Sequence, residues 1–203
     1  MNDRLFNFLL LLTALVVPVV CGGVLYSLTT DALPALSHFG LWEFMTSSEW
    51  SYAEGNEHYG ALPFITGTLL TTLLALLFCI PFSLPVSLFV GEYYKGTRMA
   101  SILSTITDLL AGIPSIIYGL WGFYLLRPLI MSLGISQQGS GILTASLVLA
   151  IMIVPYASSL SAEFIKMVPA ELKEGAYSLG ATRFEVIRHI VFPVAGSGIF
   201  SSY

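Results

Sequence analysis

The sequence contains few charged residues. Asp, Glu, Lys and Arg make up 10% of its 203 residues, whereas about a quarter of a typical soluble domain is charged. Hydrophobic residues make up 56%. A globule of this composition would leave a large apolar area facing water, which promotes aggregation. The composition therefore argues against a soluble enzyme and predicts a membrane protein with several spans.

Other features that would indicate particular functions are also missing. The two cysteines, Cys21 and Cys79, lie in apolar runs and are interpreted as packing residues, because two isolated thiols form no disulfide framework. No long basic run or zinc-type cysteine spacing indicates a nucleic-acid partner. The sequence has neither a Walker-type glycine-rich lysine loop nor an acid/base constellation. We therefore expect no catalytic residue, no metal ligand and no cofactor.

Long apolar runs predict the spans. At about 1.5 Å per residue, twenty or more residues of helix cross a hydrocarbon core of about 30 Å. A further apolar segment begins after Pro193 but is too short to cross, and we interpret it as the start of a truncated helix. The expected fold is an all-α polytopic membrane bundle with four full helices and the start of a fifth. The four runs are Leu5 to about Leu28, Leu62 to Val90, Met99 to Leu126 and Ile142 to about Ser161.

Loop charges predict the orientation. Cytoplasmic loops of membrane proteins carry an excess of Lys and Arg. With the N-terminus inside and four alternating spans, only Arg127 falls outside, and the long first external loop carries acidic residues without Lys or Arg. We therefore predict a cytoplasmic N-terminus. The residues then placed inside are Arg4, Lys95, Arg98, Lys166, Lys173, Arg183 and Arg188.

Prolines and glycines within the runs indicate a packed bundle rather than simple anchors. Proline removes a backbone donor and kinks a helix, and the freed carbonyls need partners from neighbouring helices or water. Glycines allow helices to approach closely. The prolines are Pro81, Pro85, Pro114 and Pro155, and the glycines of the third run are Gly112, Gly119 and Gly122.

The charged segment 163–192 predicts two short helices around a bend. Pro169 suits the first turn of a helix, and Gly180 suits its C-terminal end. Thr182 and Glu185 have the spacing of a capping box for a second helix, which we expect Pro193 to end. The expected buried side of the second helix consists of Phe184, Val186, Ile187, Ile190 and Val191.

This segment resembles the EAA loop of ABC-transporter permeases. That loop reads Glu-Ala-Ala, three residues, Gly, nine residues, Ile, one residue, Leu-Pro. Two positions depart from the pattern, since Gly175 replaces the first Ala and Phe192 replaces the Leu. The matching residues are Glu174, Ala176, Gly180, Ile190 and Pro193.

Two further stretches, residues 59–94 and 108–128, are similar to permease subunits of phosphate importers, the PstC type more than its PstA partner. The resemblance implies a type I ABC importer permease of the MetI-like kind. It divides the chain into an N-terminal membrane helix with an external loop (1–60) and a permease core (61–203) that is incomplete at its C-terminus. The core would include the cytoplasmic coupling loop 163–192.

The resemblance also implies a function and partners. With a second, PstA-like permease, the chain would form the path for inorganic phosphate across a bacterial cytoplasmic membrane. Two ATPase subunits would bind below and hydrolyse ATP, and an external binding protein would deliver phosphate. The implied ATPase-coupling residues are Glu174, Gly175, Ala176, Gly180, Arg183, Ile190 and Pro193.

Candidates for the substrate path are Arg127, Ser115, Tyr118 and Asp108. A guanidinium suits an oxyanion, although Arg127 can equally anchor a helix at the membrane interface. The hydroxyls of Ser115 and Tyr118 can instead satisfy carbonyls freed by Pro114. On one continuous helix Asp108 and Arg127 would lie about 28 Å apart and could not pair.

Other readings of the chain stay open. The same architecture could carry another oxyanion, such as molybdate or sulfate, or a sugar or peptide. A secondary transporter would require paired charges within the membrane, and the sequence offers no convincing pair. In a membrane-anchored scaffold the prolines and the EAA spacing would be coincidental.

Overall fold

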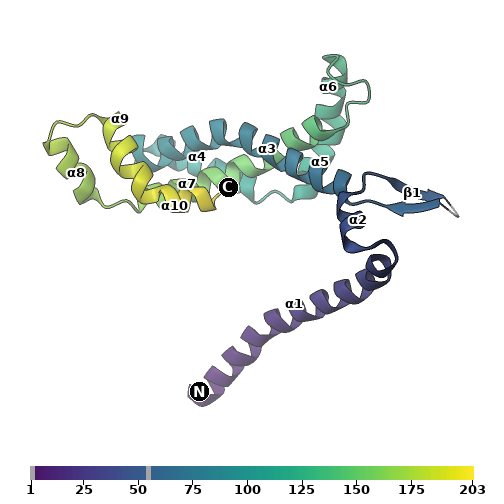
Figure 1. The fold of residues 1–203 in the computed structure, drawn as a ribbon. Helices are drawn as coiled ribbons and strands as arrows, with labels where there is room; N and C mark the ends of the chain where they lie inside the picture. The colour runs from purple at the N-terminus through teal and green to yellow at the C-terminus, as the bar shows by residue number, and fades with distance from the viewer. Residues whose placement is uncertain (1–2, 54–55) are drawn as a thin grey trace. The chain divides into compact units, whose positions relative to one another are not determined.

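The structure, a computed structural model, describes residues 3–53 and 56–203. The chain divides into two compact units, residues 1–66 and 67–203, and each is described by itself. Both are mainly helical, as predicted (Figure 1).

The first unit holds a long apolar helix followed by a small hairpin. Helix α1 (Asp3–Phe39) continues ten residues past the predicted start of the polar loop. Threonines at this end satisfy their hydroxyl groups within the helix by donating to carbonyls one turn back, such as Thr29 to Leu25 at 2.7 Å. After the short helix α2 (Leu41–Thr46), strands β1 (Trp50–Ala53) and β2 (Asn56–Tyr59) pair antiparallel. This hairpin lies in the stretch expected from the sequence to be an external loop.

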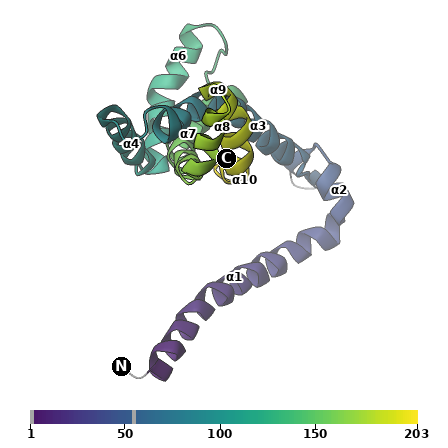
Figure 2. The same ribbon diagram turned by 90° about the vertical axis from the view of Figure 1, so that its left-hand side faces the viewer.

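The second unit is a bundle in which α3, α4 and α7 run side by side (Figures 1 and 2). Its two ends differ, since α8 and α9 lie at one end and α6 at the other (Figure 1). We call the end that carries α8 and α9 the charged end. The elements are α3 (Leu62–Leu88, which begins in the first unit), η1 (Phe89–Tyr93), α4 (Arg98–Ala111), α5 (Ser115–Trp121), η2 (Gly122–Leu126), α6 (Arg127–Ser132), α7 (Ile142–Lys166), α8 (Ala170–Ser178), α9 (Arg183–Val186), η3 (Ile187–Val191) and α10 (Phe192–Ser201), with η denoting π-helix.

Within residues 3–53 and 56–203, three stretches of helix are long and apolar enough to cross a membrane: Leu5–Pro34, Leu62–Tyr93 and Ile142–Lys166. The third predicted run is not one continuous helix. It consists of Arg98–Ala111 and Ser115–Ser132, bent by 89° at a short break, and it makes a fourth span if the two parts are counted together. The break lies at Pro114, where the missing N–H and the ring oppose a continuous helix.

The other prolines do not break their helices. Helix α3 continues through Pro81 and Pro85, and α7 continues through Pro155. Pro193 was expected to end the second coupling helix, and this expectation is wrong. The helical path runs from α9 through η3 into α10, with Pro193 at the start of α10. The wider π-helical turn before it spares the proline ring a clash with the preceding turn.

Helix α7 is the central element of the second unit. At three glycines, the backbone of another element packs directly against α7. A Cβ added at Gly91 of η1 would lie 2.8 Å from the Ile165 side chain. At Gly122 of η2 an added Cβ would collide with Val148, and at Gly198 of α10 with Phe164. The close approach predicted for Gly122 is therefore confirmed. Gly119 has no such neighbour, and a Cβ at Gly112 would meet only carbonyls of its own turn.

The main hydrophobic cluster joins α7 to the helices at the charged end. Val186, Ile187 and Val191 are buried as predicted, but Phe184 is 65% exposed and does not belong to the buried side. Phe184 lies four residues before Arg188 on the helical path that continues from α9 into η3, and these two residues share an exposed face. The buried members are Ile165, Val168, Val186, Ile187, Val191, Ala195 and Ile199.

The bend between α8 and α9 has the predicted structure. Helix α8 ends in a Schellman motif, in which the N–H groups of Gly180 and Ala181 bond to the carbonyls of Tyr177 and Ala176 at 2.9 and 3.1 Å. Gly180 has φ +86°, a conformation that side chains with a Cβ rarely adopt.

A complete capping box begins α9. The Thr182 backbone N–H donates to the Glu185 carboxylate at 2.8 Å, and the Glu185 N–H donates back to the Thr182 hydroxyl. The pKa of Glu185 lies below its usual value, first because the Thr182 backbone N–H donates to the carboxylate and then because the Thr182 hydroxyl does so. The bend thus has a defined shape and is not a loose loop.

Candidate functional site

The seven residues expected to couple the chain to an ATPase all lie at the charged end, but on different elements. Glu174, Gly175 and Ala176 lie in α8, and Gly180 forms the bend. The other three lie further along the same helical path, Arg183 in α9, Ile190 in η3 and Pro193 in α10. The predicted coupling loop began at residue 163, but the structure assigns 163–166 to α7, so the segment outside the bundle begins after Lys166.

These residues face two ways. Ala176 and Ile190 pack against the main hydrophobic cluster and fasten the bend to the bundle. Glu174, Gly175 and Arg183 are exposed, and a Cβ added at Gly175 would meet no atom within 4 Å. The glycine that departs from the EAA pattern therefore has room for the usual alanine.

The outer surface of the bend is apolar at several points. Leu179 is 90% exposed and Phe184 65%. Exposed apolar side chains at a turn of defined shape are typical of a surface that binds another protein. The bend can therefore dock into a hydrophobic cleft of a partner.

The charged end also brings together cations that are far apart in the sequence. The Lys95 ammonium donates to the Lys166 carbonyl at 3.3 Å. Lys173 of α8 forms an ion pair with Glu92 of η1. This pair is not predictable from the sequence, because its members are 81 residues apart and no local spacing connects them.

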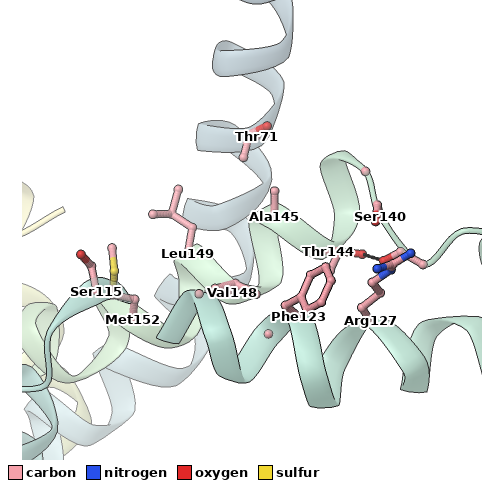
Figure 3. Close-up of a pocket in the computed structure, with 14 residues that line it drawn as sticks. Thr71, Ser115, Phe123, Arg127, Ser140, Thr144, Ala145, Val148, Leu149 and Met152 are labelled. Carbon is pink, nitrogen blue, oxygen red and sulfur yellow. Dashed lines mark hydrogen bonds between the residues drawn. The ribbon is translucent and has the colours of Figure 1, made fainter. Parts of the chain in front are cut away.

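Two of the four substrate-path candidates line one cavity, of about 500 Å³, between α5, η2 and α7. Arg127 lies near Ser140 and Thr144, and Ser115 lies near Met152 (Figure 3). About 18 Å of helix rise separates positions 115 and 127, so the two candidates mark different parts of the cavity. Most of the remaining wall is apolar or glycine, including Val148, Leu149, Gly119 and Gly122.

Arg127 is held at one side of this cavity. Its Nε donates to the Gln138 carbonyl at 2.9 Å, and its guanidinium carbon lies 5.0 Å from the centre of the Phe123 ring. Gly139 has φ +63°, and a Cβ there would lie 2.5 Å from the Arg127 carbonyl. The glycine turn therefore packs directly against Arg127 and helps to fix its position.

The other two candidates are occupied elsewhere. The Tyr118 hydroxyl donates to the Leu110 carbonyl at 2.9 Å. The Leu110 carbonyl lies four residues before Pro114 and also accepts from the Ile113 N–H at 3.1 Å, so Tyr118 supplies a second donor to the turn before the break. Asp108 accepts a 2.6 Å hydrogen bond from the Ser159 hydroxyl of α7.

No metal centre is found in the part of the chain that the structure describes. Among residues 3–53 and 56–203, no group of three or more His, Cys, Asp or Glu side chains is arranged to hold an ion.

Comparison with known proteins places this architecture. Residues 83–203 match a family described as binding-protein-dependent transport system inner membrane component. A phosphate transport system permease protein PstC from Mesorhizobium japonicum is 36% identical over 98% of this chain, and one from Haemophilus influenzae is 35% identical over 98%. A probable ABC transporter permease protein YqgH from Bacillus subtilis is 37% identical over 75% of the chain. The chain spans 65%, 68% and 49% of these three relatives, respectively.

Among solved structures, an inward-facing conformation of the MetNI methionine ABC transporter superposes with a TM-score of 0.58. The two chains are 21% identical, and the match covers 68% of this chain and 63% of the other, so this likeness concerns the fold alone. The expected MetI-like helix bundle is confirmed. The helix bundle agrees with the family match and with the 35–36% identity to phosphate permeases. The chain therefore belongs to the family of inner-membrane components of binding-protein-dependent transport systems.

Proposed function

We propose that the chain is a permease subunit of an ATP-driven phosphate importer. The single observation that carries the proposal is the identity to phosphate permeases over nearly the whole chain, at least 35% in both PstC relatives. In this proposal the chain and a second, PstA-like permease form the path for phosphate across a bacterial cytoplasmic membrane. An external phosphate-binding protein delivers the anion.

We further propose that the bend between α8 and α9 docks into an ATPase subunit. Its support is the defined Schellman turn and capping box together with the exposed apolar side chains of Leu179 and Phe184. A rigid turn transmits displacement better than a flexible loop. Closure of two ATPases on ATP would pull the bend and switch access from one face of the membrane to the other.

For the substrate path, the cavity favours Arg127 over the other candidates. Among the described residues, Arg127 makes one hydrogen bond through Nε, and its terminal amino groups make none. These groups can donate two parallel hydrogen bonds to a phosphate oxyanion. Ser115 lines the same cavity and is the second candidate. Tyr118 and Asp108 are bonded within the chain and are no longer proposed as ligands.

The function can be tested with the full-length permeases, the ATPase and the binding protein in proteoliposomes. We expect phosphate to accumulate only when ATP is present on the ATPase side. Sulfate or molybdate accumulating in place of phosphate would change the cargo. Uptake driven by an ion gradient without ATP would contradict the transporter class.

In the same vesicles, Gly180→Val should abolish phosphate uptake while ATP hydrolysis and membrane insertion persist. A β-branched residue at φ +86° costs about 1–3 kcal/mol, which the bend can avoid only by changing shape. The matched control is Gly175→Ala, a change of similar kind in α8, where a Cβ meets nothing. Normal uptake by the Gly180→Val complex would refute the coupling role of the bend.

Arg127→Ala should raise the KM for phosphate uptake about tenfold or more, because it removes a charge-assisted donor. Arg127→Lys should recover part of the loss, since an ammonium keeps the charge but not the paired donors. Arg98→Ala, an arginine at the charged end, serves as the control. Equal KM values for Arg127→Ala and the unchanged protein would leave Arg127 as an interfacial anchor.

Single cysteines can test the predicted orientation. With Cys21 and Cys79 replaced, Leu179→Cys in the bend should react with a membrane-impermeant maleimide only in inside-out vesicles. Tyr52→Cys in the hairpin, where the side chain is 84% exposed, should react only in intact cells stripped of their outer membrane. The opposite pattern would place the N-terminus outside.

A further inference from the structure

The ion pair between Glu92 and Lys173 joins the bend to the membrane bundle. Among the described residues it is the only ion pair. Its side chains are 11% exposed at Lys173 and 13% at Glu92, so both charges lie largely out of water. Removing one partner would leave the other charge buried without compensation, and a buried, uncompensated charge is unfavourable.

Lys173 is the one buried residue of α8. The other contacts that fasten this helix are apolar and non-directional, such as the packing of Ala176 against the main hydrophobic cluster. The hydrogen bond within an ion pair restricts both the distance and the direction between the two side chains. Lys173 is thus the point at which α8 is fixed to the bundle in a defined register.

Glu92, in turn, belongs to an element that cannot slide freely. It follows Gly91, where an added Cβ would lie 2.8 Å from Ile165 and 3.0 Å from the Ala162 carbonyl. The η1 segment therefore packs on the α7 backbone, and it continues α3 without a break. A displacement of Glu92 is passed to both α3 and α7.

The surroundings of the pair leave room for movement. A cavity of about 230 Å³ lies beside Glu92 and is lined by Tyr93, Tyr177, Arg183 and Ile187. A second cavity, of about 550 Å³, lies on the side of Lys95, Lys166 and Lys173. A second cation, Arg183, therefore lines a cavity beside the carboxylate. The two charged side chains are therefore bordered by cavities on two sides.

We propose that the Glu92–Lys173 ion pair is the positioning contact that transmits movement of the bend to α3 and α7. The inference rests on the proposed coupling role of the bend and adds a route into the membrane helices. Glu92 and Lys173 act through the elements that they join and touch neither phosphate nor nucleotide. The required property is the opposite charge of the two positions, whichever of them carries which sign.

The test compares neutral and exchanged charges in the reconstituted full complex, with phosphate transported per ATP hydrolysed as the readout. Glu92→Gln and Lys173→Met should each lower this ratio at least tenfold, while ATP hydrolysis stays within about twofold of the unchanged complex. The double variant Glu92→Lys with Lys173→Glu should restore the ratio to within about threefold. Lys95→Gln, a nearby lysine that bonds to a carbonyl, is the control and should keep the ratio.

Each outcome of this experiment either supports or overturns the proposed role of the ion pair. Single variants that keep the normal ratio would overturn the proposal, as would a charge exchange that assembles but stays uncoupled. If the single variants fail to assemble, the exchanged pair decides, because it should both assemble and couple, and its failure to do either overturns the proposal. An unchanged complex that takes up no phosphate would instead refute the proposed function, which separates the two questions.

Discussion

Close packing around α7 is the constraint on which the second unit depends. Gly91, Gly122 and Gly198 come from three different elements, and each has its backbone against α7 at a point where a Cβ has no room. Within a membrane the hydrophobic effect does not drive helices together, so association depends on such close contacts and on interhelical hydrogen bonds. Ser146 of α7 supplies one of these by donating to the Thr71 carbonyl of α3 at 3.1 Å.

The same environment explains how the chain tolerates its prolines and hydroxyl groups. Each polar group in the hydrocarbon region has to be satisfied within the protein. Ser158 does so by bonding to a carbonyl one turn back, and Tyr118 bonds to the Leu110 carbonyl in the turn before Pro114. Among the described residues, no buried side-chain nitrogen or oxygen lacks a partner.

The two candidate sites lie at opposite ends of the bundle and differ in construction. The bend at the charged end has its shape determined by backbone hydrogen bonds, a glycine with positive φ and an ion pair. The cavity near Arg127 has walls of small and apolar residues, with one guanidinium held in place by Gln138 and Phe123. Phosphate transport by alternating access would require the first site to act on the second through α3 and α7, since these helices reach from one end towards the other (Figure 1).

Local signals in the sequence determined the helical elements and the bend. Gly180, Thr182 and Glu185 act through hydrogen bonds within a few residues, so their spacing alone specified the Schellman turn and the capping box. The apolar runs likewise located the helices that can cross a membrane. Tertiary structure alone decided which side chains meet: Glu92 with Lys173, Asp108 with Ser159, and Gly122 with Val148. It also decided that Pro114 breaks its helix while Pro81, Pro85 and Pro155 do not. These outcomes depend on the packing of segments distant in the sequence, and no local pattern of residues encodes that packing.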